Sequence, residues 1–434
     1  MRIFSEVLKK YLVLICRKFL KLVLKFNKPN LYFLSLYLIS RKIKSSYSDK
    51  KIIIFVNGGG ELDINAANLN GKFKGTIIFV EKIFTDDLFY NFFDGFCGDY
   101  QFDEFKEDNK ANYEIYFNFI DKFVHSAIKR KIVGFFNFNN IYASHQAFIE
   151  SAYKNNIKFV TYYKECLKPD ALWDDFEDIM SFRPPINLPK INNVLVHNDR
   201  AAEYYKNIGY PKSRIKIVGQ ARSFYLEHKE ENRDCNRKKV ITYFIVHPGS
   251  GLPNFPVDFL QNRSQDEKNW IKSRTRQKLD STIVSALLEY QKNNIENISL
   301  IFKGKQKLWN KNHKSHTDVR FFSGDPMLDL FQKSDVVIGF NTTAIIESVR
   351  VGTQAIQADL EFIEGKNENK YKFDFGKVVW LPKSKDELFR TLDNILFKDL
   401  KCKTKEKDKI LERCLGPKDA ALRLNIAIND IFFK

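Results

Sequence analysis

The chain has 434 residues, and 44% of them are hydrophobic, including 40 Phe and 19 Tyr, so it can fill two sizeable cores and is not a disordered chain. Six scattered cysteines, without a C-x-x-C pair, argue against a zinc site or a disulfide framework and fit a reducing cytoplasm. The net charge is +18, and residues 1–51 supply +11 of it, from 13 Lys and Arg against 2 Asp and Glu.

The first segment, residues 1–45, predicts basic amphipathic helices. Bulky apolar residues cover much of the predicted helix surface. Five basic residues share one of its faces: Lys10, Arg17, Lys21, Lys25 and Lys28. Because the charge is interleaved with apolar residues, the pattern favours an anionic membrane surface over nucleic acid as partner. The apolar piece at residues 31–40 is too short to span a bilayer. The alternative is a helical hairpin that packs on the protein's own surface.

Strands and helices alternate from residue 51 onward, which predicts an α/β fold with parallel sheets. Strands are predicted at residues 51–56, 76–80, 131–136, 158–162 and 193–197, and residues 42–51 are predicted to be a linker. The first strand leads directly into Asn57, Gly58 and Gly59. A Gly-rich turn after a strand is a usual ligand-binding position in α/β proteins, but no G-x-G-x-x-G pattern and no Walker lysine are present.

Lys164 and Glu165 follow the strand at residues 158–162, at the rim where such sheets bind ligands. A carboxylate there suits a general base that removes a proton from an acceptor hydroxyl. A surface ion pair is the alternative interpretation. His145 and Glu150 are other possible bases, although a lone His on a helix is more often structural.

A second α/β domain is predicted from residue 239, after a charged linker at residues 223–237. Its first strand, residues 239–246, precedes Gly249, Ser250 and Gly251, whose amides and hydroxyl suit phosphate groups. Lys303 and Lys305 follow the strand at residues 298–302 and form either an anion site or a solvated basic loop.

Residues 334–356 predict a strand, a tight loop, a helix and another strand. Gly339 ends the first strand, and Asn341, Thr342 and Thr343 then cap the helix, whose free N–H groups make it a ready anion site. Glu347 lies one to two turns further along that helix. A last strand is predicted at residues 378–381, with charged helices after it.

Four passages, in this order along the chain, resemble GT-B glycosyltransferases that build bacterial surface polysaccharides of the capsule and O-antigen type. They lie around Glu165, Gly219, Asn341 and, as the loosest match, Ala420. The resemblance implies two Rossmann-like domains of the GT-B type, with the donor nucleotide held mainly by the second and the acceptor by the first. It implies neither a metal nor a cofactor beyond the nucleotide-sugar co-substrate, because lysines, helix N-termini and amides stabilise the leaving phosphate.

The resemblance also assigns roles to residues. Glu165 would be catalytic, and Asn57, Gly58, Gly59, Lys164 and His145 would border the acceptor. The donor would bind to Gly249, Ser250, Gly251, Lys303, Lys305, Asn341, Thr342, Thr343 and Glu347, with the Thr-rich loop at the phosphates and Glu347 at the ribose.

The expected domains are residues 1–45, the membrane-surface helices; 46–225, the acceptor domain; 236–400, the donor domain; and 401–434, the C-terminal helices. The expected activity is transfer of a sugar from a nucleotide sugar to a lipid-linked surface glycan, at the cytoplasmic face of the plasma membrane. Alternatives are a polyol-phosphate transferase using a CDP-linked donor, a non-hydrolysing sugar-nucleotide epimerase, and an inactive GT-B scaffold. An epimerase would have no reason for the basic N-terminal helices.

Overall fold

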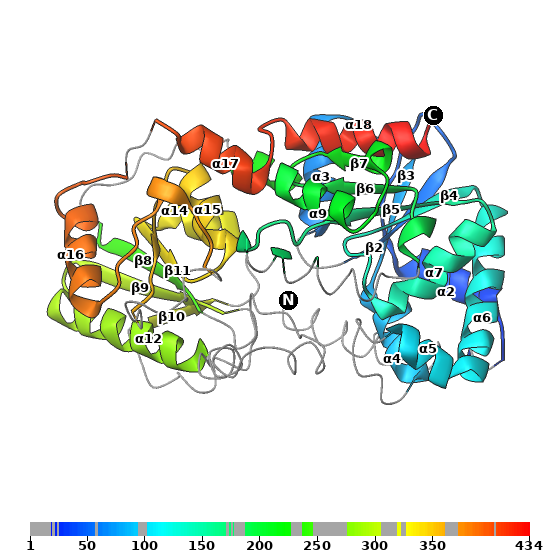
Figure 1. Ribbon diagram of the computed structural model, residues 1–434, viewed down its shortest axis with the longest axis horizontal. Helices are drawn as coiled ribbons and strands as arrows, with labels where there is room; N and C mark the ends of the chain where they lie inside the picture. Colours follow the sequence, from blue (N-terminus) through cyan, green and yellow to red (C-terminus); the bar gives the residue numbers. More distant parts are fainter. Residues whose placement is uncertain are drawn as a thin grey trace. The chain divides into compact units, whose positions relative to one another are not determined.

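The computed structural model describes residues 19, 22–23, 26–56, 60–93, 102–170, 173–174, 177, 187–226, 237–245, 276–304, 319–322, 327–360, 372–402 and 405–434. The chain forms two compact units (Figure 1). Unit 1 comprises Met1–Cys166, Glu177–Arg222 and Gly416–Lys434, and unit 2 comprises Leu167–Phe176 and Ser223–Leu415.

Unit 1 is built on a seven-stranded sheet in the order β1-β3-β2-β4-β5-β6-β7. Its strands are β1 (Arg41–Ile43), β2 (Lys51–Phe55), β3 (Thr76–Val80), β4 (Ile132–Asn137), β5 (Lys158–Tyr163), β6 (Asn193–Val196) and β7 (Ile215–Ile217). All pairs are parallel except β1 with β3. The prediction of a linker from residue 42 was therefore wrong at its start, because Ile43 pairs with Ile77 and extends the sheet edge.

Helices cover both faces of this sheet, so its central strands are apolar throughout, and Ile52, Ile53 and Ile54 are all 0% exposed. The helices of unit 1 are α2 (Pro29–Ile39), α3 (Gly60–Asn70), α4 (Asp86–Phe92), α5 (Phe102–Asp108), α6 (Lys110–Ile128), α7 (Ala143–Lys154), α9 (Asp199–Asn207) and α18 (Ala420–Phe432). On one face of β4, Phe135 meets Phe123 of α6 and Phe148 of α7.

The C-terminal helix α18 packs with α3 on the opposite face (Figure 1). Gly134 of β4 makes room for it, since a Cβ there would lie 2.2 Å from the Phe432 ring. Two asparagines of α18 fasten it to the end of α3 and the following loop: Asn425 Nδ2 donates to the Ala67 carbonyl at 3.1 Å, and Asn429 Oδ1 accepts from the Lys74 amide at 2.8 Å. The last helix of the chain thus completes the core of unit 1.

Unit 2 has a five-stranded parallel sheet in the order β10-β9-β8-β11-β12. Its strands are β8 (Lys239–Phe244), β9 (Ile298–Lys303), β10 (Val319–Phe322), β11 (Val336–Gly339) and β12 (Gln354–Gln357), and its helices are α12 (Arg276–Asn293), α14 (Met327–Lys333), α15 (Thr343–Arg350), α16 (Lys385–Leu396) and α17 (Lys407–Leu415). Residues of α12 and α16 share one core cluster with the sheet, and residues of α15 and α17 share another.

The strand predicted at residues 378–381 is reduced to a single bridge between Trp380 and Ile356. Pro382 accounts for the short pairing, because it has no N–H group to continue a ladder and restricts the backbone of the residue before it.

Helix α2 belongs to unit 1 and packs against α6. Tyr32 is fully buried, makes edge-on contacts with Phe119 and Phe123, and donates a hydrogen bond to the carbonyl of Phe84. Burial raises the pKa of its hydroxyl, which therefore stays protonated and can donate. Among the residues that the structure describes, no helix has the length and apolarity needed to cross a membrane.

Two segments of unit 1 border Ser223–Leu415, the long insertion that forms most of unit 2. The first ends at Arg222, whose amide and guanidinium bind the two carboxylate oxygens of buried Asp63 at 2.7 and 3.2 Å. The second begins at Gly416, which lies against Gly219 with both residues at positive φ, +83° and +82°. Both segments are therefore fixed to unit 1 by its own side chains and backbone.

Candidate functional site

Each sheet has one position where the connections leave in opposite directions, and this topological switch point is where open parallel sheets bind ligands. In unit 1 it lies between β2 and β4, and in unit 2 between β8 and β11. The strands β2 and β8, after which the sequence predicts Gly-rich turns, border these points. The residues of these turns, Asn57, Gly58, Gly59, Gly249, Ser250 and Gly251, lie outside the described residues, as does Lys305.

In unit 2 the loop after β11 leads into α15, whose N-terminus lies at the switch point. Thr342 is the N-cap residue, and its hydroxyl accepts a hydrogen bond from the Ala344 amide at 3.4 Å. Thr343 is the first helical residue, and both threonines are partly exposed. The helix dipole and the first-turn N–H groups favour an anion here, which is where the sequence predicts the donor phosphates.

Asn341 has a structural role in the loop before α15, and its predicted contact with the donor phosphates stays a prediction. It adopts φ of +46°, a left-handed conformation that Asn tolerates better than most residues. Its side chain is 8% exposed, and Oδ1 accepts the Phe373 amide at 3.0 Å. Asn341 therefore shapes the loop before α15 and ties the segment at Phe373 to it.

Glu347 lies one turn into α15 and is 3% exposed. It is thus a buried carboxylate, and burying a charge requires polar partners around it. Its predicted contact with a ribose stays a prediction. Lys303 is the last residue of β9 and is partly buried, at the same edge of the sheet.

The end of β12 carries a polar group that the sequence reasoning missed. Asp359 is 3% exposed, and its Oδ2 lies 3.4 Å from Nζ of Lys372. Gln357 donates from Nε2 to the Phe373 carbonyl at 3.1 Å. Among the described residues, Oδ1 of Asp359 and Oε1 of Gln357 have no hydrogen-bond partner. The available signal was the placement of two polar residues at the carboxyl end of a strand, Gln357 as its last residue and Asp359 two residues later, at the edge where ligands bind.

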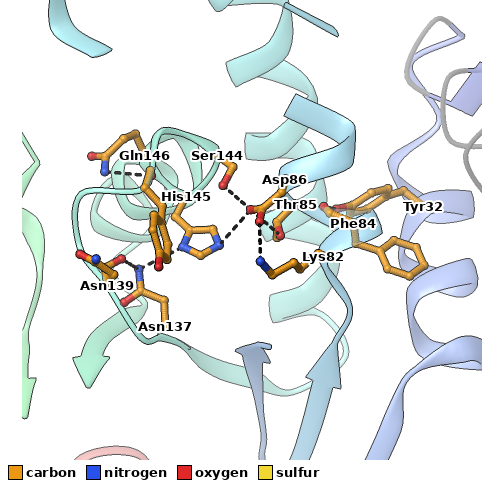
Figure 2. Close-up of polar contacts among 11 residues, drawn as sticks. Tyr32, Lys82, Phe84, Thr85, Asp86, Asn137, Asn139, Ser144, His145 and Gln146 are labelled. Atoms are coloured by element: carbon orange, nitrogen blue, oxygen red, sulfur yellow. Dashed lines mark hydrogen bonds and ion pairs between the residues drawn. The ribbon is translucent and has the colours of Figure 1, made fainter. Parts of the chain in front are cut away.

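In unit 1 a network of buried polar side chains holds the loop after β4 (Figure 2). Asn137 accepts a hydrogen bond from Thr161 Oγ1 at 2.7 Å and donates to the Asn139 carbonyl at 2.8 Å. His145 Nδ1 lies 3.3 Å from Asn137 Nδ2, and the imidazole stacks on Phe55. Burial lowers the pKa of His145 to about 4, so the ring is neutral at pH 7. His145, predicted at the acceptor side, is 3% exposed and positions Asn137 from within the fold.

Asp86 of α4 lies beside His145, on the other side from Asn137 (Figure 2). Its carboxylate accepts the Ser144 hydroxyl at 2.6 Å, and Lys82 Nζ and His145 Nε2 lie at 3.7 and 3.9 Å. The Asp86 side chain is 26% exposed, so it is open to solvent while its neighbours Ser144 and His145 are buried. The sequence signal was a cluster of polar residues after the strand at residues 76–80, and no role was assigned to it from the sequence.

Lys164 and Glu165 follow β5 directly, as predicted, and their charged groups are 4.0 Å apart. The two side chains differ in exposure, 17% for Lys164 and 53% for Glu165. Cys166 anchors the segment, because its Sγ contacts the Tyr163 carbonyl and the His197 amide while its own carbonyl accepts from Asn198 Nδ2. The result is an accessible carboxylate on a fixed backbone at the carboxyl edge of the sheet.

No cluster of three or more His, Cys, Asp or Glu side chains able to hold a metal ion occurs among the described residues.

The sequence matches no protein-family model and no curated protein sequence. Its structure is similar to solved structures of sugar-nucleotide enzymes. One, from Listeria monocytogenes and assigned as a UDP-N-acetylglucosamine 2-epimerase, is 13% identical with a TM-score of 0.51, over 89% of this chain and 97% of the other. Another UDP-N-acetylglucosamine 2-epimerase is 9% identical with a TM-score of 0.51, over 90% and 98% of the two chains. These epimerases share the GT-B fold with glycosyltransferases, so the predicted fold class is confirmed.

Proposed function

We propose that this protein is an enzyme that binds a nucleoside-diphosphate sugar and inverts a carbon of its sugar ring. The observation that carries the nucleotide part is the N-terminus of α15, capped by Thr342 and placed at the switch point beside β8. A diphosphate matches such a helix start in charge and in hydrogen bonding. This arrangement belongs to unit 2, where the sequence predicts the donor.

The epimerase alternative takes precedence over sugar transfer because of the comparisons. The proteins with TM-scores of 0.51 share the fold over 97% and 98% of their lengths and are named as 2-epimerases. A proton on the ring carbon beside the anomeric carbon can be removed by a base when the electron pair of that C–H bond expels the nucleoside diphosphate. Return of a proton to the opposite face from an acid, with re-addition of the nucleoside diphosphate, gives the inverted sugar. Glu165 and Asp86, two solvent-accessible carboxylates after strands of unit 1, supply groups of that kind.

The test is proton exchange in the absence of any acceptor. The protein is incubated in D2O with UDP-, GDP- and CDP-linked sugars, and the sugar protons are followed by NMR. An epimerase places deuterium on the inverted carbon and yields a second sugar nucleotide. A chain whose melting temperature rises with a nucleotide sugar, but which leaves every sugar proton in place, is not an epimerase.

A second candidate is transfer of the sugar to a lipid-linked glycan, the activity that the sequence resemblance implies. One observation favours it: Glu165 is half exposed on an anchored segment, as a base for an incoming hydroxyl must be. Incubation with a radiolabelled nucleotide sugar and a membrane extract tests it, because transfer moves the label into the lipid fraction. A product of the capsule or O-antigen class is proposed only for this transfer reaction, and not for the epimerase.

A further inference from the structure

Helix α2 presents two apolar faces, and unit 1 covers only one of them. The covered face carries Tyr32, Phe33 and Leu36, which are 0%, 4% and 0% exposed and lie against α6 and its surroundings. Asn30 at the start of the helix accepts hydrogen bonds from Ser126 and Arg130 at 2.7 and 3.4 Å. These contacts fix the rotation of α2, so its other face points away from α6.

The outward face consists of large apolar side chains. Leu31, Leu34 and Leu38 have spacings of three and four residues and form one stripe, with 44%, 51% and 71% of their surfaces exposed. Ile39 is 49% exposed, and Phe26, just before the helix, is 63% exposed. Single exposed leucines are ordinary, but a contiguous set on one short helix marks an interaction surface.

Along the chain, the charges that flank this stripe are all positive, although Arg41 forms an ion pair with Glu61 of α3. Helix α2 contains no charged residue, and Lys28, Arg41, Lys42 and Lys44 flank it. Between Glu6 and Asp49 the sequence has ten Lys and Arg and neither Asp nor Glu. Lys28 and Lys44 are exposed, whereas Lys42 is partly buried over the Tyr37 ring. The partner of this surface must therefore be both apolar and anionic.

We propose that the α2 surface, formed by Phe26, Leu31, Leu34, Leu38 and Ile39 with Lys28 and Lys44 beside it, docks on an anionic lipid bilayer. The leucine stripe enters the boundary between headgroups and acyl chains, and the lysines contact lipid phosphates. A second copy of the chain fits less well, because two such surfaces would bring like charges together. This inference rests on the contacts of α2 and is tested by vesicle binding, so it can stand or fail whichever of the two candidate reactions the protein catalyses, although membrane binding suits sugar transfer to lipid better than epimerisation.

Co-sedimentation of the full chain with vesicles tests the proposal. Vesicles of phosphatidylcholine with about one third phosphatidylglycerol should bind the protein at least tenfold more tightly than phosphatidylcholine alone, since each lysine near an anionic surface adds attraction. Raising the salt concentration should weaken binding. Equal binding to the neutral vesicles would overturn the charge argument.

Substitution separates the α2 surface from other exposed leucines. The double variant L34E/L38E should lose binding by tenfold or more with an unchanged melting temperature, since both side chains face solvent. The control L400E alters a leucine of unit 2 that is 46% exposed, and it should bind as the unaltered chain does. The proposal fails if L34E/L38E still binds vesicles normally, or if light scattering shows a dimer that L34E/L38E abolishes.

Discussion

Gly416 packs directly on Gly219, and neither position has room for a side chain. A Cβ on Gly416 would lie 1.9 Å from the His197 carbonyl oxygen and 2.6 Å from the Gly219 Cα, and a Cβ on Gly219 would lie 2.6 Å from that of Ala420. Gly219 precedes the point where the chain leaves unit 1, and Gly416 is where it returns. The contact thus joins the two ends of the insertion that forms unit 2.

Replacing Gly416 with Ala should lower the free energy of unfolding by roughly 3 kcal/mol or more, because the left-handed backbone strains an L residue and the new methyl group meets fixed backbone atoms. Urea unfolding measures the loss. Gly209→Ala is the matched control, since Gly209 has φ of +86° but a Cβ added there would meet nothing within 4 Å. Gly209→Ala should lower the free energy of unfolding by only about 1 kcal/mol. Equal losses for the two variants would mean that the packing at Gly416 is unimportant.

The buried imidazole of His145 should make stability depend on pH. Its pKa is lowered to about 4 by burial, against an ordinary value of 6.5, so the unfolded chain binds a proton that the folded chain does not. The contribution of the neutral His145 ring to the free energy of unfolding is therefore full above pH 6.5 and is lost as the pH falls towards 4. The free energy of unfolding should fall by roughly 3 kcal/mol over that range for this reason. The free energy of unfolding is measured with urea between pH 7 and 4.5 for the unaltered protein and for His145→Gln. The variant keeps the pH dependence that comes from carboxylates and lacks the part that comes from His145. The same pH dependence in both proteins would contradict the prediction.

Asn341→Ala should destabilise unit 2 by about 2–3 kcal/mol, because it leaves the buried Phe373 amide without an acceptor and places Ala at a positive φ. It should also weaken nucleotide binding, since the loop sets the start of α15. Asn341→Gly is the matched variant, because it removes the acceptor but relieves the strain of the positive φ, so it should lose less stability than Asn341→Ala. Thermal unfolding and nucleotide titration give the two readouts. A change in nucleotide binding alone, with stability intact, would contradict the structural role and favour the predicted direct contact with the phosphates.

Glu165→Gln should abolish turnover while sparing both fold and nucleotide binding. The side chain is 53% exposed, so the stability change should stay within about 0.5 kcal/mol. Loss of an acid–base group lowers the rate roughly 10²–10⁴-fold. Deuterium uptake by a sugar nucleotide, or label transfer to lipid, measures the rate. Glu203→Gln on α9, equally exposed and paired with Lys206, should leave it unchanged. Normal turnover by Glu165→Gln would remove Glu165 from the mechanism.

The sequence predicted the fold well where the local pattern determines structure. The β-branched runs at residues 51–56 and 76–80 became β2 and β3, because strands buried on both faces need apolar residues throughout. Thr342 was also predictable as a helix cap, since capping is local.

Contacts between distant residues could not be predicted in the same way. The bond from Phe373 to Asn341 spans 32 residues, and the pair of Asp63 and Arg222 spans 159. The spacing of apolar residues along the sequence does not indicate which distant residues come into contact. Asp86 and Asp359 were missed for this reason, because their importance comes from neighbours supplied by other elements.

The position of α18 has a consequence for synthesis of the protein. This helix covers one face of the sheet of unit 1, yet it follows the whole of Ser223–Leu415 in the chain. Ribosomes need roughly 10–40 s to make such a length, at 5–20 residues per second. During that interval the surface of α3 that receives Asn425 is complete but uncovered. The core of unit 1 therefore cannot be completed until α18 has been synthesised.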